Sequence, residues 1–184
     1  MVMKEAVDLL EEVLTEEQLK MLHDLDYFIA PASTRHHLSV KGGLAQHSLN
    51  VTNRMLQMND KMNYGIKRDW IIIMGMLHDL VKLSYGYEEN LTLKGEQHKS
   101  IPYKANYKFD IGHGAGSIYL AINELKLNLP VPVASAIYHH MGFEFPRDSY
   151  SVNVIKKNPI DMLCVLLLQH GDQLATYVDE MEYD

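Results

Sequence analysis

The most apolar segment of this sequence also carries charged groups. Residues 70–83 read WIIIMGMLHDLVKL, so a histidine, an aspartate and a lysine come directly after a run destined for the interior. A buried charge is costly unless it is paired with an opposite charge or bound to a metal ion. Any fold of this chain must therefore supply such compensation around His78, Asp79 and Lys82.

Helical periodicity dominates the rest of the chain and predicts an all-α fold. We expect helices at residues 3–14, 16–28, 44–58, 70–83, 113–127 and 131–141, and a last helix that begins after Asn158. Thr15, Asp69 and Asn158 are the expected N-cap residues, and Pro159 suits a first helical position. Segment 70–83 is apolar nearly all round, which predicts a helix at the centre of a bundle. We expect no strands, repeats or linkers.

Residues 84–112 lack a clear period, and long irregular segments in compact domains are usually functional or disordered. The aromatic residues of this segment are Tyr85, Tyr87, Tyr103, Tyr107 and Phe109. Its lysines (94, 99, 104, 108) balance its carboxylates (88, 89, 96, 110), so the segment is locally neutral. Aromatic rings stack on bases with about 1–3 kcal/mol each in single-strand binders, which makes this segment a candidate for contacting a substrate base.

Composition limits the partners. Seventeen basic against twenty-four acidic residues give a net charge of −7, which argues against a broad surface for duplex nucleic acid. The single Cys164, within MLCVLLL, excludes disulfide frameworks and four-cysteine zinc sites and indicates a reducing compartment. The start resembles an acidic amphipathic helix rather than a signal peptide, and no apolar run is long enough for a membrane span. We therefore expect a cytoplasmic protein without membrane partners.

Potential metal ligands fall on five separate helices. They are His47, His78, Asp79, His113, His139, His140 and Asp172. His47 shares an inward stripe with Leu44 and Val51, and Lys82 follows His78 by four residues, so its side chain reaches the same side of the helix. Any one of these histidines alone is more often a hydrogen-bonded structural residue than a ligand. The glycines in GHGAG do not make a dinucleotide fingerprint, because no strand precedes them.

The order His, then His-Asp-x-x-Lys, His, His-His and Asp resembles the HD-domain superfamily of metal-dependent phosphohydrolases. The similar pieces are HHLSVKGGLAQHSLNV, MLHDLVK and LLLQHGDQLATY, and the likeness covers about residues 35–177. Within that superfamily, this sequence most resembles the HD module of bacterial 3′→5′ exoribonucleases and of relaxase-associated HD proteins. The resemblance implies a single HD-type domain over residues 1–184. Its N-terminal helices (1–30) would pack on the metal-binding core.

The resemblance also implies roles for individual residues. The first metal would be held by His47, His78, Asp79 and Asp172. Asp79 would bridge to a second metal, completed by His113 with His139 or His140. Helical phase favours His140, but the first histidine of the pair stays open.

Substrate contacts are implied for further side chains. Lys82 would act with Asp79 in catalysis by facing the substrate phosphate or the attacking water. His36 and His37 would support phosphate binding or hold the metal ligands in place. Arg35 and Arg147 are candidate phosphate anchors, although a solvated surface charge is an equal reading of both.

The activity implied is hydrolysis of a phosphomonoester or phosphodiester, in a nucleotide or short oligonucleotide, by a metal-activated water. One or two divalent ions would serve, and Mn, Fe, Co, Ni and Zn all suit imidazole and carboxylate ligands. The sequence HHMGFEFP departs from the Gly-Tyr-Pro signature of the branch that cleaves cyclic dinucleotides, so that substrate is not expected. An HD-type di-iron oxygenase and a non-catalytic nucleotide-binding regulatory module remain alternatives, and Lys82 favours hydrolysis. Formation of a homo-oligomer stays open.

Overall fold

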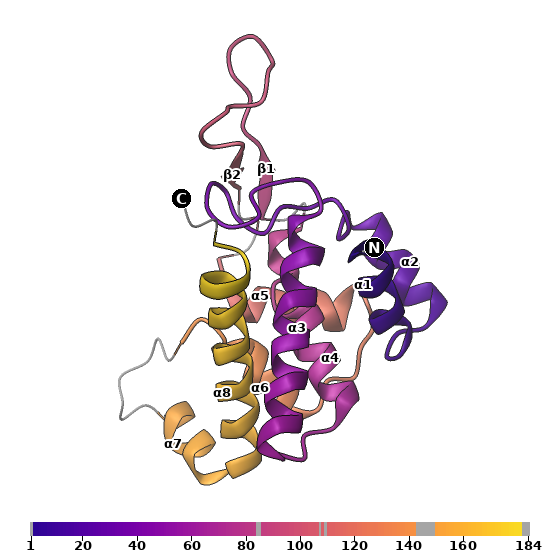
Figure 1. Ribbon diagram of the computed structural model, residues 1–184, viewed down its shortest axis with the longest axis vertical. Helices are drawn as coiled ribbons and strands as arrows, with labels where there is room; N and C mark the ends of the chain where they lie inside the picture. The colour runs from indigo at the N-terminus through magenta and orange to yellow at the C-terminus, as the bar shows by residue number, and fades with distance from the viewer. Residues whose placement is uncertain (1, 84–85, 107, 109, 143–149, 182–184) are drawn as a thin grey trace.

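The computed structural model describes residues 2–83, 86–106, 108, 110–142 and 150–181. Within these ranges the chain is a helical bundle, which confirms the expected all-α class (Figure 1). The helices are α1 (Val2–Glu11), α2 (Glu16–Asp24), α3 (Gly43–Met62), α4 (Arg68–Leu77), α5 (His113–Asn123), α6 (Val131–His139), α7 (Tyr150–Lys157) and α8 (Pro159–Leu174). A short 3-10 helix, η1 (Leu80–Lys82), follows α4, and a π-helical turn, η2 (Ala175–Asp179), follows α8.

Helix α4 lies at the centre of the bundle, as its uniformly apolar sequence predicts. Its residues Ile72 and Met76 belong to a core shared with α1, α2 and α5. Ile71 and Met74, on the other side of the helix, belong to a second core shared with α6 and α8. The helix is therefore buried on both faces, and His78 and Asp79, which follow at its C-terminal end, are 0% and 2% exposed.

Glycines let the central helices approach one another closely. A Cβ atom on Gly75 would lie 2.3 Å from Thr52 Oγ1 on α3, and one on Gly171 would lie 2.7 Å from Met55 Cγ. At Gly114 a Cβ atom would lie 2.5 Å from the carbonyl oxygens of Ile137 and Tyr138. Gly114 thus packs the start of α5 against the end of α6, and Gly116 packs α5 against η1, where a Cβ atom would lie 2.8 Å from Val81 Cγ2.

Two of the three expected N-caps are correct. Thr15 caps α2 with a complete capping box, in which its Oγ1 accepts from Gln18 N and Gln18 Oε1 accepts from Thr15 N. Asn158 precedes α8, with Pro159 in the first turn. The expectation for Asp69 was wrong, because α4 begins at Arg68 with Lys67 at the N-cap and Asp69 lies within the first turn.

The structure corrects several other expectations. Helix α4 ends at Leu77, so the expected continuous helix over 70–83 is broken at His78 and Asp79. Helix α7 was not expected, since no helix was predicted between residue 141 and Asn158. Two short strands, β1 (Tyr87–Glu89) and β2 (Tyr103–Ala105), lie in the segment for which no strand was expected.

The two strands form an antiparallel hairpin that projects from one end of the bundle (Figure 1). Tyr87 pairs with Ala105, Glu88 with Lys104, and Glu89 with Tyr103. The backbone N–H of Tyr103 donates to the carbonyl of Thr34 at 3.3 Å, so the base of the hairpin is tied to the loop that precedes α3. Three aromatic residues proposed for base stacking, Tyr85, Tyr107 and Phe109, lie outside the described residues.

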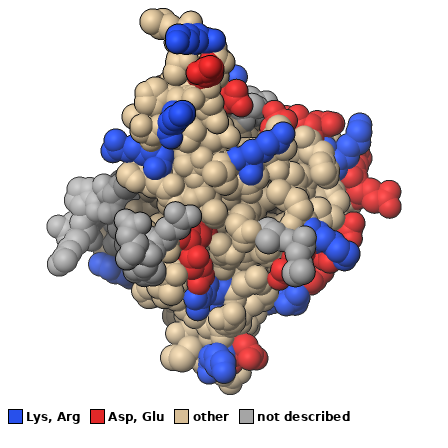
Figure 2. All heavy atoms as spheres, turned by 45° about the horizontal axis from the view of Figure 1, so that its top comes forward, with Lys and Arg blue, Asp and Glu red and all other residues tan. Residues whose placement is uncertain are grey.

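In the part of the chain that the structure describes, the distribution of charged side chains on the surface gives no broad basic patch on the face that Figure 2 shows. On the face drawn in Figure 2, acidic and basic side chains of the described residues are interspersed. None of the described helices is both long enough and apolar enough to cross a lipid bilayer.

Candidate metal centre

Side chains from five segments of the chain surround the carboxylate of Asp79. His78 Nε2 lies 3.3 Å and His47 Nε2 3.8 Å from Asp79 Oδ2, whereas His113 Nε2 lies 2.8 Å and His140 Nε2 3.4 Å from Oδ1. Asp172 Oδ1 in turn lies 3.2 Å from His47 Nε2. We call this set, His47, His78, Asp79, His113, His140 and Asp172, the Asp79 cluster.

The break after α4 is what brings His78 and Asp79 to this position. His78 is the C-cap of α4, and Asp79 leaves the helical conformation with φ −110° and ψ 23°. The chain then turns into η1, so Lys82 returns toward the cluster and its Nζ lies 2.6 Å from Asp79 Oδ2.

Two histidines have their tautomer fixed by the backbone. Nδ1 of His78 lies 2.9 Å from the carbonyl oxygen of Gly75, and Nδ1 of His140 lies 2.7 Å from that of Ile137. A carbonyl oxygen can only accept, so each Nδ1 carries the hydrogen and each Nε2 presents a lone pair. Both Nε2 atoms are buried and have no hydrogen-bond partner within the described part of the chain. Unpartnered inward lone pairs of this kind fit a metal ion.

The geometry forms two groups of potential ligands that share Asp79. In one group, ligand atoms of His47, His78 and Asp79 all lie within 4.8 Å of one another. In the other, the same holds for Asp79, His113 and His140. His47, His78, Asp79 and His140 are each at most 4% exposed, so a cation here would interact with them at low dielectric.

Charge pairing keeps both carboxylates of the cluster ionised without a bound cation. Burial alone would raise the pKa of Asp79, but the positive charge of Lys82 and the hydrogen bond with His113 Nε2 oppose it, and the pKa lies well below its usual range. Burial likewise opposes ionisation of Asp172, yet its hydrogen bond with His47 lowers the pKa to about 2. The same bond and one to Glu180 overcome the burial of His47 and raise its pKa to about 9. Ionised carboxylates are the form that binds metal.

Of the adjacent pair of histidines, the structure brings His140 to the cluster and not His139. His139 ends α6 and is buried, with its ring at 4.8 Å and 86° to the ring of Tyr138. Its carbonyl accepts a hydrogen bond from Gln169 Nε2 at 2.6 Å. The helical phase argument for His140 agrees with this placement.

The proposed phosphate contacts are more scattered. His37 lies beside the cluster, with its ring centroid 5.1 Å from that of His47. Arg35 and His36 are exposed and hydrogen-bond to each other at 3.3 Å, Arg35 Nε to His36 Nε2. Arg147 lies outside the described residues.

Sequence reasoning missed Glu180. Its side chain is 1% exposed and its Oε1 lies 3.0 Å from His47 Nδ1, on the side of the ring opposite Asp172. Asn50 Nδ2 also donates to Glu180 Oε1 at 2.9 Å, and Arg54 pairs with the adjacent Asp179. A carboxylate on the outer nitrogen of a ligating histidine orients the ring and fixes its tautomer. Glu180 follows Asp172 by eight residues, a helical same-face spacing that could have indicated it.

Comparison with known proteins agrees with this arrangement. The family model described as HD domain matches residues 44–170. Dihydroneopterin 2′,3′-cyclic phosphate phosphodiesterase of Methanocaldococcus jannaschii is 32% identical over 128 residues, which cover 67% of this chain and 46% of the relative. The chain therefore matches slightly less than half the length of that relative. No solved structure matches the chain. The buried His-Asp pair, the ligand groups around it and the family match together establish that this chain belongs to the HD-domain superfamily of metal-dependent phosphohydrolases.

Proposed function

We propose that this protein is a metal-dependent phosphodiesterase that hydrolyses a small phosphorylated compound with a nucleotide-like heterocycle. The observation that carries the proposal is the convergence on Asp79 of histidine Nε2 atoms, two of which are fixed as lone-pair donors and lack any hydrogen-bond partner among the described residues. A structural zinc site would more typically be closed and rich in cysteine.

The Asp79 cluster would hold one or two divalent ions. His47, His78, Asp79 and Asp172 would bind one, and Asp79 with His113 and His140 would bind the other. A divalent ion supplies Lewis acidity and makes a nucleophilic water available at neutral pH. Imidazole and carboxylate ligands suit Mn, Fe, Co, Ni or Zn alike, so the identity of the ion must be measured.

Lys82 would stabilise the charge that develops on the phosphate. Its ammonium group lies against Asp79, at the edge of the cluster, and its side chain is only 11% exposed. A fixed positive charge in such a water-poor site stabilises a developing oxyanion more strongly than it would in bulk water. Oxygen activation at a di-iron centre has no evident use for this lysine, so Lys82 favours hydrolysis over the oxygenase alternative.

The relative narrows the substrate class. Its name specifies a 2′,3′-cyclic phosphate of a pterin, which is a small diester attached to a heterocycle. We therefore favour a cyclic or linear diester of this size over a short oligonucleotide. His37, beside the cluster, would contact the phosphate or hold His47, whereas Arg35 and His36 lie on the exposed part of the same loop.

We further propose that residues 1–184 act as one HD-type unit in the cytoplasm. Helix α1 contacts both α3 and α4, which supports the N-terminal helices as part of the core. The single cysteine, Cys164, is buried and free, in keeping with a reducing compartment.

The test is metal analysis of the purified protein followed by assays with a generic aryl phosphodiester, cyclic nucleotides and neopterin cyclic phosphate. We expect bound divalent metal and metal-dependent hydrolysis, which Asp79→Asn abolishes without changing the circular dichroism spectrum. Asp60→Asn, an exposed aspartate on α3, is the matched control and should retain full activity. Hydrolysis that persists in Asp79→Asn, or oxygen consumption in place of hydrolysis, would refute the proposal.

A further inference from the structure

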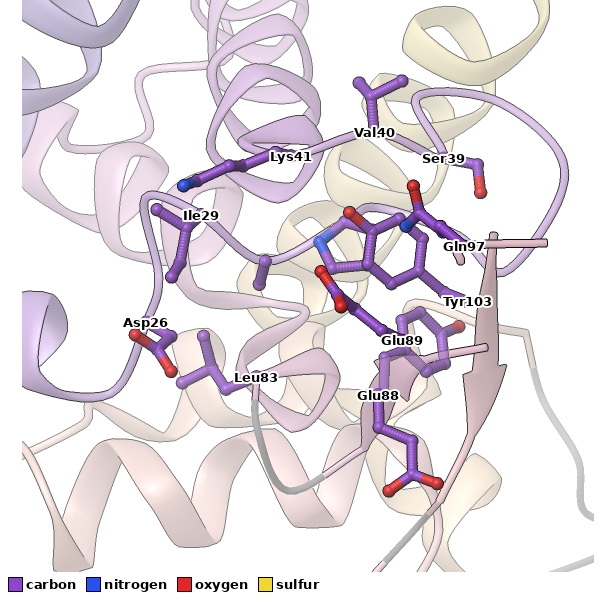
Figure 3. Close-up of a pocket in the computed structure, with 13 residues that line it drawn as sticks. Asp26, Ile29, Ser39, Val40, Lys41, Leu83, Glu88, Glu89, Gln97 and Tyr103 are labelled. Atoms are coloured by element: carbon purple, nitrogen blue, oxygen red, sulfur yellow. The ribbon is translucent and has the colours of Figure 1, made fainter. Parts of the chain in front are cut away.

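A pocket of about 470 Å³ lies between the hairpin and the segment 26–41 (Figure 3), and none of its lining residues belongs to the Asp79 cluster. Leu83 and Tyr103 give the pocket a buried apolar floor. Asp26, Lys41 and Glu89 line it with exposed charged groups. An apolar floor with a few polar groups at the edge is suited to a flat heterocycle whose rim carries hydrogen-bonding atoms.

Strand register explains which hairpin side chains face the pocket. Glu89 and Tyr103 are directly paired across the two strands, so both side chains project from the same face of the hairpin. Figure 3 shows both of them extending into the pocket, while the carboxylate of Glu88 turns the other way. Glu88 is engaged there by Lys104 Nζ at 2.9 Å and Asn106 Nδ2 at 2.6 Å. Glu89 makes no side-chain hydrogen bond or ion pair among the described residues, so its oxygens are available to a ligand.

The pocket and the Asp79 cluster share two short pieces of chain. Leu83 in the pocket directly follows Lys82, whose ammonium contacts Asp79. Ser39 in the pocket comes two residues after His37, which lies against His47. Consecutive Cα atoms are about 3.8 Å apart, so two residues span at most about 7 Å. The two sites therefore share the stretches 37–39 and 82–83, and a substrate whose phosphate lies at the cluster would extend along them to place its ring in the pocket.

The charges of the lining residues favour a different chemical group in the pocket from the phosphate expected at the cluster. Among the lining residues, the carboxylates of Asp26 and Glu89 outnumber the single ammonium of Lys41 once Glu88 is paired with Lys104. This balance disfavours a phosphate in the pocket and favours N–H donors. A carboxylate can accept two parallel hydrogen bonds when a ring N–H and an exocyclic amine are adjacent, as in the aminopyrimidinone ring of guanine and of pterins.

We propose that this pocket binds the aminopyrimidinone ring of the substrate, with Glu89 accepting hydrogen bonds from its adjacent N–H groups. The proposal rests on the proposed function, because it assigns one end of the same substrate whose phosphate lies at the Asp79 cluster. It makes Glu89 a specificity-determining residue that does not take part in the chemistry.

The test is equilibrium binding of phosphate-free rings to the full chain loaded with Mn²⁺. Neopterin, guanosine and inosine are titrated by fluorescence or calorimetry, and inosine is the probe that lacks the exocyclic amine. We expect at least one of neopterin and guanosine to bind, and inosine to bind at least about tenfold more weakly. Whichever of the two binds identifies the source of the ring.

The decisive variants are Glu89→Gln and its neighbour Glu88→Gln. Losing a charge-assisted bond should weaken binding of the preferred ring by about tenfold or more in Glu89→Gln, and Glu88→Gln should stay within about twofold. The control Glu88→Gln should also hydrolyse a generic aryl phosphodiester at the parent rate, since its carboxylate faces Lys104 and Asn106. Equal binding of inosine, equal effects of the two variants, or no ring binding by a protein that hydrolyses the generic diester would overturn the pocket assignment. Ring binding that depends on Glu89, without any diester hydrolysis, would support the pocket and contradict the proposed function.

Discussion

The Asp79 cluster and the hairpin are built in opposite ways: the cluster lies among the packed helices, and the hairpin projects from one end of the bundle (Figure 1). Most of the cluster is buried. Its residues come from helices that pack so closely that glycines are needed at the contacts. The hairpin is exposed over most of its length, including the apolar residues Leu91 and Leu93. Chemistry at the cluster would depend on side chains held in place by this close packing. Recognition would depend on a projecting segment that can vary without unfolding the core.

The largest effect should come from the cluster, in the comparison of His140→Ala with His139→Ala. His140→Ala removes a buried Nε2 that faces Asp79, so we expect about a 10²–10³-fold loss of kcat/KM and a lower metal content. His139→Ala should retain metal, because that side chain belongs to neither ligand group among the described residues. Metal content and kcat/KM, measured side by side on the two variants, show which of the two histidines belongs to the metal site. The reverse order of effects would assign the site to His139.

A glycine substitution in the bundle tests whether the close helix approach is essential. Gly75→Val would place a Cβ atom 2.3 Å from Thr52 Oγ1 and 2.9 Å from Thr52 Cα, so α3 and α4 would have to separate. We expect a loss of about 1–3 kcal/mol in the free energy of unfolding, measured by urea denaturation. Combining it with Thr52→Ala should recover part of that loss. Simple additivity of the two changes would show that the contact is not the cause.

Glu180 links the cluster to the C-terminal turn, and its substitution should weaken metal binding without removing a ligand. We expect Glu180→Ala to lower metal affinity by about 10–100-fold, because His47 loses the carboxylate that orients its ring. Glu180→Gln keeps an oxygen acceptor for His47 Nδ1 and should retain most of the affinity. The measurement is competition with a fluorescent chelator. An equal loss in both variants would indicate that Glu180 is itself a ligand.

The packed helices of the cluster could be predicted from the sequence more fully than the hairpin could. The helices around the cluster carry a strong apolar period, so α3, α8 and the start of α4 could be predicted from the sequence. The HD-type pattern indicated the candidate ligands, but helical phase only favoured His140 and left His139 open. The break at His78 was not predicted, because the apolar run continues through Leu80 and Val81 and masks the end of the helix. The strands β1 and β2 were missed because they depend on contacts far away in sequence, such as Tyr103 with Thr34. For Glu180 only its spacing from Asp172 was a signal, and its contact with His47 lies 133 residues away in sequence.

The smallest effect should come from an ion pair in the hairpin, compared with an ion pair of the same kind beside the cluster. Lys104 and Glu88 are about half exposed, so water already solvates both groups and Lys104→Ala should leave the melting temperature within about 1 °C. Arg54 pairs with Asp179, next to Glu180, with both side chains about 30% exposed or less. Arg54→Ala should therefore loosen the turn that holds Glu180 and weaken metal binding several-fold. Thermal melts and chelator competition on both variants, with and without metal, give the comparison directly. If Lys104→Ala proved as damaging to metal binding as Arg54→Ala, the hairpin would have to be part of the metal site's support, and the division between the two regions would be wrong.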